Sequence, residues 1–384
     1  MIKVAFGKPH FKINEIKEIN HSLKNSWVGT GPKTKIFEDN FKKFKKSKYA
    51  IAVSSCTSAL HLSLLALGIK KGDEVITTSM TFCSTINAIL HAGAKPVLLD
   101  INKNTINLNE NEIENKITKK TKCLVVVHFA GLPCKMDVIM KIAKKNNLKV
   151  IEDCAHAVEA NLNNIPVGTF GDTGCFSFYA NKNLSTGEGG MVITNKKIIE
   201  KKVRLLSLHG LSKNAWKRFT NSKFATYDII ETGYKYNMTD LQASLGIHQL
   251  SYIKQNLKLR NSIWETYSNN LQEQPIILPA KKFDKNIRHS FHLYTIKIKK
   301  RFKFNRDILA NELQKRGIVT GIHYKSIADF KYYKKLLNLN VKKYKNSINY
   351  GKETLSLPIY PSLKKRDQMY VIECIKNILK KYNV

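Results

Sequence analysis

The sequence predicts an α/β protein. Its large domain, residues 1–250, would hold a mainly parallel mixed sheet flanked by helices, and a smaller α+β domain would follow at 251–384. The chain of 384 residues exceeds the size at which one hydrophobic core usually stops growing, which predicts two domains. From Tyr49 onward, short β-rich runs alternate with helical stretches, as in proteins with parallel sheets. After about Leu250 a long helical stretch replaces this alternation.

The alternating part supplies one strand–helix unit after another. Strands are expected at Ala50–Val53, Glu74–Thr77, Pro96–Asp100, Cys123–Val127, Leu148–Asp153, Cys175–Phe178 and Met191–Thr194. Helices are expected at Thr57–Leu67, Cys83–Ala92, Leu108–Ile117, Met136–Asn146 and Thr239–Leu250. In a parallel sheet ligands gather at the carboxyl ends of the strands, so functional side chains are expected there.

The smaller domain is predicted from helical periodicity with few strands. Its helices are expected at Ile253–Leu271, Arg306–Arg316 and Arg366–Lys381, with strands near Phe291–Ile298. Lys-rich runs such as Lys42–Lys48 are expected to be solvated helix faces.

Composition excludes several classes of protein. The net charge of +36 suggests a polyanion partner, but only 8 of the 65 basic residues are arginine, none before Arg204. Because base and phosphate recognition favour arginine, no nucleic-acid partner is expected. No apolar run of about 18 residues and no signal-peptide core occur, so a cytoplasmic protein without membrane contact is expected. The seven dispersed cysteines suggest reduced packing residues, and no cluster has metal-ligand spacing, so no metal is expected.

Residues 174–194 are the stretch around which the chemistry is organised. They read as a strand, a polar loop that carries Lys182, a turn rich in glycine and a second strand. Burial disfavours the ammonium form of lysine, so an amine on such a loop could condense with an aldehyde as a Schiff base. A solvated surface lysine is the alternative, and it is the expectation for most of the 57 lysines taken singly.

Three further stretches suggest a ligand. Ser54–Ser58 ends one strand and opens a helix, where free N–H groups favour a phosphate, although ordinary N-capping explains the residues equally well. Phe82 could stack on a planar ring or lie in the core. Asp153 ends a hydrophobic strand and could keep a ring nitrogen protonated, with His156 near a ring oxygen. A capping aspartate and a core histidine are the alternative for this last pair.

Together these residues supply a phosphate cradle, a stacking ring, a carboxylate for a pyridinium and a Schiff-base lysine, the parts that pyridoxal phosphate requires. Neither a dinucleotide-binding glycine turn nor a Walker loop is found. In an ordered set of motifs the sequence resembles the DegT–DnrJ–StrS sugar aminotransferase family, which has the type I aspartate-aminotransferase fold. The motifs are Trp27–Lys33, Ser54–Leu60, Gly72–Ile76, Asp153–His156, Ser177–Leu184, Gly187–Gly190, Gly233–Asp240, Gly321–Tyr324 and Leu357-Pro358.

The resemblance implies a role for each cofactor residue. Lys182 forms the Schiff base, Asp153 binds the pyridine nitrogen, His156 lies near the phenolic oxygen and Phe82 stacks on the ring. The phosphate is held by Thr57, Ser58 and Ser177, and by Asn237 from the partner subunit of a homodimer with shared active sites. The loop at Gly233–Asn237 has no obvious route back to its own phosphate cradle, which agrees with this sharing.

A lysine, where some relatives carry histidine, implies transamination rather than dehydration. The stretches around Ser207–Phe219 and Gly233–Asn237 look most like enzymes that move an amino group from glutamate to C4 of a nucleotide-linked keto-sugar. His323 and Tyr324 are the candidates for sugar contacts, and Lys217 and Arg218 for the nucleotide diphosphate, with solvated positions as the alternative for the latter pair. Amination at C3 and a non-enzymatic regulatory role remain open as alternatives.

Overall fold

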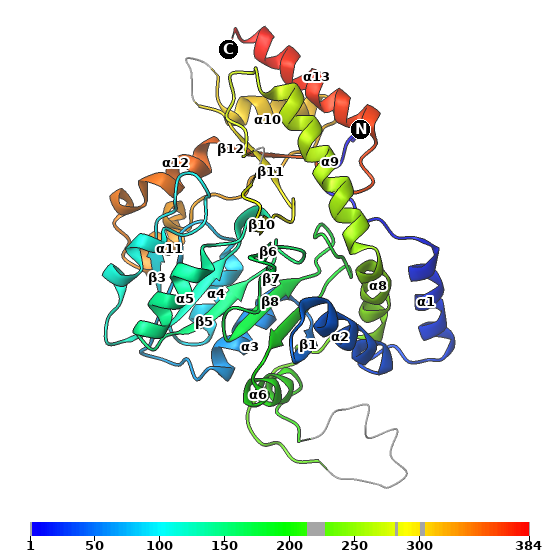
Figure 1. The fold of residues 1–384 in the computed structure, drawn as a ribbon, viewed down its shortest axis with the longest axis vertical. Helices are drawn as coiled ribbons and strands as arrows, with labels where there is room; N and C mark the ends of the chain where they lie inside the picture. The colour runs from blue at the N-terminus through cyan, green and yellow to red at the C-terminus, as the bar shows by residue number, and fades with distance from the viewer. Residues whose placement is uncertain (1, 213–226, 281–282, 300–303, 384) are drawn as a thin grey trace.

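A computed structural model describes residues 2–212, 227–280, 283–299 and 304–383. Its centre is a seven-stranded sheet of order β1-β9-β8-β5-β4-β2-β3 (Figure 1). These strands are β1 (Tyr49–Val53), β2 (Glu74–Thr78), β3 (Lys95–Leu99), β4 (Thr121–Val127), β5 (Lys149–Asp153), β8 (Thr173–Ser177) and β9 (Gly190–Thr194). Only β9 runs antiparallel to its neighbours within this sheet, so the predicted mainly parallel mixed sheet is confirmed.

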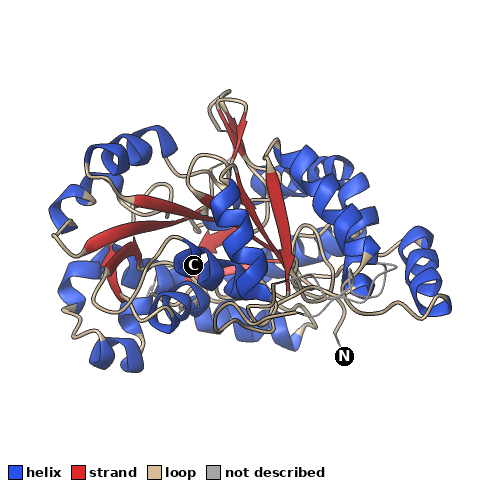
Figure 2. Cartoon of the chain, turned by 90° about the horizontal axis from the view of Figure 1, so that it is seen from below, coloured by secondary structure: helices blue, strands red, loops and turns tan. Residues whose placement is uncertain are grey.

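Helices cover both faces of the sheet (Figures 1 and 2). They are α2 (Pro32–Lys45), α3 (Cys56–Ala66), α4 (Cys83–His91), α5 (Met136–Lys145), α6 (Lys197–Ser207) and α8 (Asp240–Ser251), and α1 (Ile13–Lys24) packs on α8 (Figure 1). Successive residues of β5 point to opposite faces of the sheet. Ile151 packs in the core formed with α3, and Val150 packs in the core formed with α5. A strand that is buried on both faces is a continuous apolar run in the sequence, and β5 could be predicted for this reason.

Two local predictions were wrong. The expected helix at Leu108–Ile117 is instead a pair of short 3-10 helices, η1 (Glu110–Glu112) and η2 (Glu114–Lys116). This segment is fixed at its start because Leu108 bridges Ile101 and the Asn107 side chain bonds to the carbonyls of Leu132 and Pro133. The Lys42–Lys48 run is not uniformly solvated, because Lys45 is only 1% exposed and its Nζ donates to the Val158 carbonyl at 3.1 Å.

The C-terminal part is built on the long helix α9 (Ile253–Leu271), which rises from α8 toward α13 (Figure 1). It also contains β11 (Tyr294–Lys297), α10 (Arg306–Lys315), α11 (Lys331–Leu336), α12 (Lys345–Glu353), β12 (Thr354–Leu357) and α13 (Lys365–Lys381). β11 and β12 pair antiparallel, and the short strands β6 (Asn161–Leu162), β7 (Ile165–Pro166) and β10 (Ile287–Arg288) form a third sheet. One core joins α9, α10, α13, β11 and β12 with Val4. The division at residue 250 stays a prediction.

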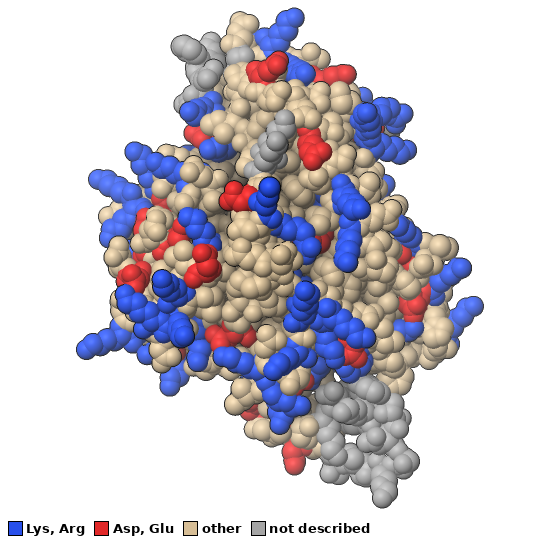
Figure 3. Space-filling view, viewed as in Figure 1, with Lys and Arg blue, Asp and Glu red and all other residues tan. Residues whose placement is uncertain are grey.

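Lysine and arginine are spread over the visible face of the molecule, with fewer acidic residues among them (Figure 3). Within the described residues no helix is both long and apolar enough to cross a membrane. All seven cysteines are free, and six of them are buried, whereas Cys83 is half-buried.

Candidate active site

A cavity of about 380 Å³ lies at the carboxyl ends of β1, β4, β5 and β8. It brings together eight of the residues predicted from the sequence, which are Thr57, Phe82, Asp153, His156, Ser177, Lys182, His323 and Tyr324. The first and the last of these residues lie more than 260 positions apart in the chain, so only folding brings them together. Their chemical roles stay predictions, and their geometry shows what each group can do.

Asp153 is the last residue of β5 and is 4% exposed. One carboxylate oxygen accepts from the Ala155 N–H at 3.1 Å and the other from the Thr85 hydroxyl at 2.9 Å. Burial raises the pKa of Asp153, and these two donors and the Lys182 charge oppose the rise. A buried carboxylate that accepts only two hydrogen bonds of ordinary length from the described residues favours a cationic N–H donor in the cavity.

Lys182 lies on the loop between β8 and β9, two buried antiparallel neighbours in the sheet. Backbone bonds from Lys182 N to Tyr179 O at 2.9 Å and from Thr186 N to Phe178 O at 2.8 Å fold the loop into turns. Desolvation lowers the pKa of Lys182 to about 8, against the weaker opposing charges of Cys56 and Asp153. The neutral amine, which a nucleophilic lysine requires, is therefore more abundant near neutral pH than in an ordinary lysine.

His156 and Tyr324 form a hydrogen-bonded pair at the cavity. The Ala130 N–H donates to His156 Nδ1 at 3.3 Å, so the proton of the neutral ring lies on Nε2. Burial lowers the pKa of His156 well below its usual value, and the Lys182 charge adds to this effect. Nε2–H therefore donates to the Tyr324 hydroxyl at 2.9 Å, which leaves the hydroxyl proton of Tyr324 free to donate to another oxygen.

His323 and Phe82 occupy other parts of the cavity wall. The Nδ1 of His323 lies 2.9 Å from the Ser356 hydroxyl, and burial lowers the pKa of His323 to about 3. Phe82 is the N-cap residue of α4 and is 57% exposed, with its ring 5.8 Å from that of Tyr324. An exposed aromatic face at a cavity is suited to stacking on a planar ligand.

The first turn of α3 forms the predicted phosphate cradle. Ser55 caps the helix by accepting from the Ser58 N–H at 3.1 Å. The Ser58 hydroxyl donates to the Ser55 carbonyl at 2.7 Å and does not line the cavity, whereas Thr57 does. Gly190 lets β9 pass close to this cradle, since a Cβ there would lie 2.4 Å from the Ser55 carbonyl. Phosphate contact by Ser58 stays a prediction.

Asn237 lies apart from Lys182 and lines a separate cavity of about 690 Å³. The expectation that its loop has no route back to its own cradle was wrong, because Asn237 bridges Val53 and the Ser54 N–H donates to the Tyr236 carbonyl at 2.7 Å. The Asn237 amide donates to the Thr30 hydroxyl at 2.6 Å. A contact of Asn237 with a partner subunit stays a prediction. Lys217 and Arg218 lie outside the described residues.

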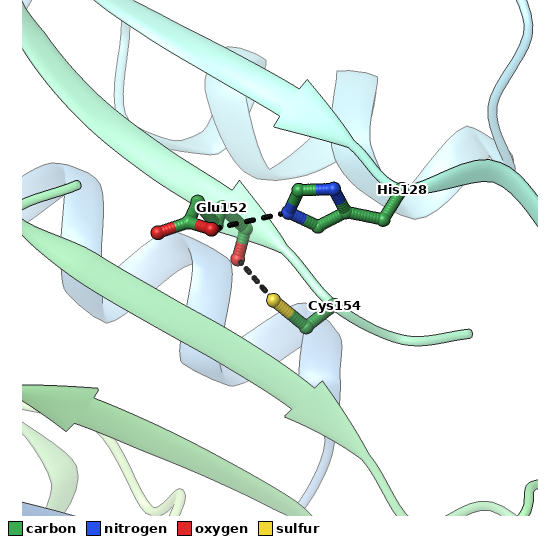
Figure 4. Close-up of side chains that lie close together, drawn as sticks. All are labelled: His128, Glu152 and Cys154. Atoms are coloured by element: carbon green, nitrogen blue, oxygen red, sulfur yellow. Dashed lines mark hydrogen bonds and ion pairs between the residues drawn. The ribbon is translucent and has the colours of Figure 1, made fainter. Parts of the chain in front are cut away.

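Next to Asp153, the buried residues His128, Glu152 and Cys154 lie close enough together to suggest a metal site (Figure 4). The Glu152 carboxylate already accepts four hydrogen bonds, from His128 Nε2 and from the N–H groups of Gly168, Phe170 and Gly171. His128 Nδ1 accepts from the Cys134 N–H, and burial raises the pKa of the Cys154 thiol well above its usual value. With these lone pairs in use, the group is a structural hydrogen-bond centre.

The prediction from sequence missed several residues at this site. Cys56, Asn181 and Glu188 also line the cavity, and Thr85 bonds Asp153 from the first turn of α4. Asn181 and Glu188 lie inside motifs that the sequence analysis quoted, so their positions were available. Thr85 carried no signal, because its role depends on the packing of α4 against β5.

Comparisons with known proteins show the family of the chain. The family model of the DegT/DnrJ/EryC1/StrS aminotransferases matches residues 9–376. The uncharacterised protein MJ1066 of Methanocaldococcus jannaschii is 45% identical over 99% of both chains. The spore coat polysaccharide biosynthesis protein SpsC of Bacillus subtilis is 42% identical over 98% of this chain and 97% of its own. The pyridoxamine phosphate form of Spr1654 from Streptococcus pneumoniae, described as a sugar aminotransferase, superposes with a TM-score of 0.92 at 30% identity, over 99% of this chain and all of its own.

The cavity fits the cofactor named in the Spr1654 structures. A buried carboxylate short of donors suits a protonated ring nitrogen, a lysine with lowered pKa suits an aldehyde, and a helix N-terminus with Thr57 suits a phosphate. Spr1654 is also known in a form with pyridoxal phosphate, at a TM-score of 0.91. The cofactor is pyridoxal phosphate, and the chain belongs to the DegT/DnrJ/EryC1/StrS aminotransferase family.

Proposed function

We propose that this protein transfers an amino group from glutamate to the C4 ketone of a nucleotide-linked 4-keto-6-deoxy sugar, making an amino sugar for a surface glycan. The observation that carries the transamination is the placement of Lys182, with its lowered pKa, in one cavity with Asp153. The polysaccharide pathway named for SpsC and the sugar substrate named for Spr1654 support the sugar and its destination.

Each residue has a separate task in this proposal. When bound, pyridoxal phosphate supplies an aldehyde and an electron-accepting ring. Lys182 would hold the cofactor through its side-chain amine, and the same amine would act as general base and acid toward the proton on the α-carbon of the amino donor. Asp153 keeps the ring nitrogen protonated, and Thr57 and Ser177 bind the phosphate. Phe82 covers the ring.

The pair of His156 and Tyr324 would orient oxygen atoms in the cavity. Because His156 Nε2–H donates to Tyr324, the tyrosine hydroxyl can give its own proton to an oxygen of the ligand. Burial raises the pKa of Tyr324, so the hydroxyl stays a neutral donor throughout the physiological range. His323, also neutral, has its ring 5.0 Å from the ring of Tyr324 and would contact the sugar beside it.

We also propose that the working unit is a homodimer in which Asn237 reaches the phosphate of the partner. Lys182→Ala and a bulky substitution at Asn237 should each abolish activity. If sites are shared, refolding the two inactive variants together should recover about a quarter of the wild-type activity, because half of the dimers are mixed and each has one intact site. An active monomer in sedimentation would contradict sharing.

The substrate test is a panel of UDP-, dTDP- and GDP-linked 4-keto and 3-keto sugars, each with glutamate. Amination should appear as the mass of an amino sugar, and the position of the new nitrogen follows from fragmentation of the product. Preference for 3-keto sugars would overturn the assignment of C4. Turnover of free keto acids alone would overturn the sugar substrate.

A further inference from the structure

A buried ion pair lies behind the loop that carries Lys182. Arg260, on α9, binds the carboxylate of Glu159, which follows β5 in the chain. The two side chains are 1% and 2% exposed, and neither lines the cavity of about 380 Å³. Burying two charges is costly, and an ion pair of this kind often adds little to stability compared with apolar residues. Its contacts point to another role.

Asn183, the residue after Lys182, links the loop to this pair. Its amide hydrogens bond to Glu159 Oε2 at 2.9 Å and to the Ser290 carbonyl at 3.0 Å. Its amide oxygen accepts from His292 Nδ1 at 2.9 Å. All the strong hydrogen-bonding groups of the Asn183 side chain are therefore engaged, which fixes the backbone beside Lys182.

The same network is fixed on its other side. Arg260 Nε donates to the Ser290 carbonyl at 3.3 Å, so arginine and asparagine share that acceptor. Arg288 Nε donates to the Glu159 carbonyl at 2.7 Å. The ring of His292 lies 4.5 Å from the ring of His156 at the cavity wall. The contacts thus run without a break from α9 to the cavity.

We infer that Glu159 and Arg260 are positioning residues, which hold Lys182 in register with Asp153 through the side chain of Asn183 and so couple the placement of α9 to the reactive amine. The inference rests on the proposed role of Lys182. It assigns no contact with substrate or cofactor to either residue.

A substitution at this pair should act on the loop. In Arg260→Met the Glu159 carboxylate stays buried without its counter-ion, and the asparagine that depends on it loses its fixed partner. A small displacement of a reactive group costs catalysis strongly, so the rate of the glutamate half-reaction should fall roughly a hundredfold while the KM for glutamate changes less.

Two readouts separate positioning from general destabilisation. With the cofactor bound, the pH at which its visible absorption band changes should shift in Arg260→Met, because Lys182 is no longer held in the same environment. Amide hydrogen exchange of the peptide that contains Lys182 should become roughly tenfold faster, with peptides from β4 and β5 unchanged.

The matched control is Arg204→Met, which breaks another arginine–glutamate pair (Arg204 Nη2 to Glu38 Oε2, 2.8 Å) that contacts neither the loop nor this cavity. It should lower Tm while leaving the band and the exchange of the Lys182 peptide as in the wild type. The double variant Glu159→Leu/Arg260→Met, which removes both buried charges, should recover Tm but keep the altered band and exchange.

The inference is overturned if the double variant recovers the wild-type absorption band and the wild-type exchange of the Lys182 peptide as well as the Tm. It is also overturned if Arg204→Met changes the band and the exchange as Arg260→Met does. A wild type with a normal cofactor band that fails to react with glutamate would refute the proposed function instead. The band and exchange results would still decide whether the pair positions the loop.

Discussion

Glu152 and Asp153 are neighbours on β5, yet their carboxylates meet opposite environments. Glu152 accepts four hydrogen bonds from described residues of the protein. Asp153 accepts two at ordinary length and opens onto the cavity. Because successive strand residues point to opposite faces, one strand supports the fold on one side and presents chemistry on the other. The comparison teaches that incomplete hydrogen bonding of a buried charge, more than burial itself, marks the functional side.

The largest effect is expected at the amine that faces Asp153. Lys182→Ala should abolish turnover, since no other described residue of the cavity offers a primary amine. Borohydride treatment followed by peptide mass analysis should find the cofactor on Lys182 in the wild type and none on the variant. Labelling of a different lysine would contradict the assignment.

Asp153→Asn should reduce turnover by several orders of magnitude, because the ring nitrogen would lose the carboxylate that keeps it protonated. The carboxamide oxygen can still accept from the Ala155 N–H, and its NH₂ group can donate to the Thr85 hydroxyl, so the Tm should change little. The measurement is kcat for the glutamate half-reaction beside a thermal melt. Near-normal turnover would mean that another group pairs with the ring.

The lowered pKa of Lys182 predicts that the rate of covalent cofactor uptake depends on pH. Below about 8 the ammonium form dominates, so covalent uptake of pyridoxal phosphate by cofactor-free protein should rise about tenfold per pH unit and level off above pH 8. Stopped-flow absorbance of the visible band measures this rate. A rise that continues to pH 10 would show a lysine with its ordinary pKa.

The smallest effect on turnover is expected from Glu152→Gln. The new NH₂ group would face backbone N–H donors, so the free energy of unfolding should fall by about 1–3 kcal/mol. Turnover per folded molecule should stay near the wild-type value. If Glu152→Gln lowered kcat as strongly as Asp153→Asn, the division of β5 into a structural face and a chemical face would be wrong.

The sequence allowed the sheet and the centre of the site to be predicted because both depend on local patterns. Apolar runs identified β4 and β5, and their ends located Asp153, while the motif around Lys182 located the loop. The ion pair of Glu159 and Arg260 was not predicted, because the charges lie 101 residues apart in the chain and only folding brings them together. The segment Leu108–Ile117 was misread because the contacts of Asn107 with a distant loop override its helical spacing.

The buried Lys45 has a practical consequence in a chain with 57 lysines. Desolvation lowers the pKa of both Lys45 and Lys182 to about 8, but Lys45 is 1% exposed whereas Lys182 opens onto a cavity. An amine-directed reagent applied briefly below pH 8 to the cofactor-free protein should therefore tag Lys182 early and Lys45 only after unfolding. The two lysines together would serve as a built-in pair of reporters, one for access to the active site and one for loss of the native core.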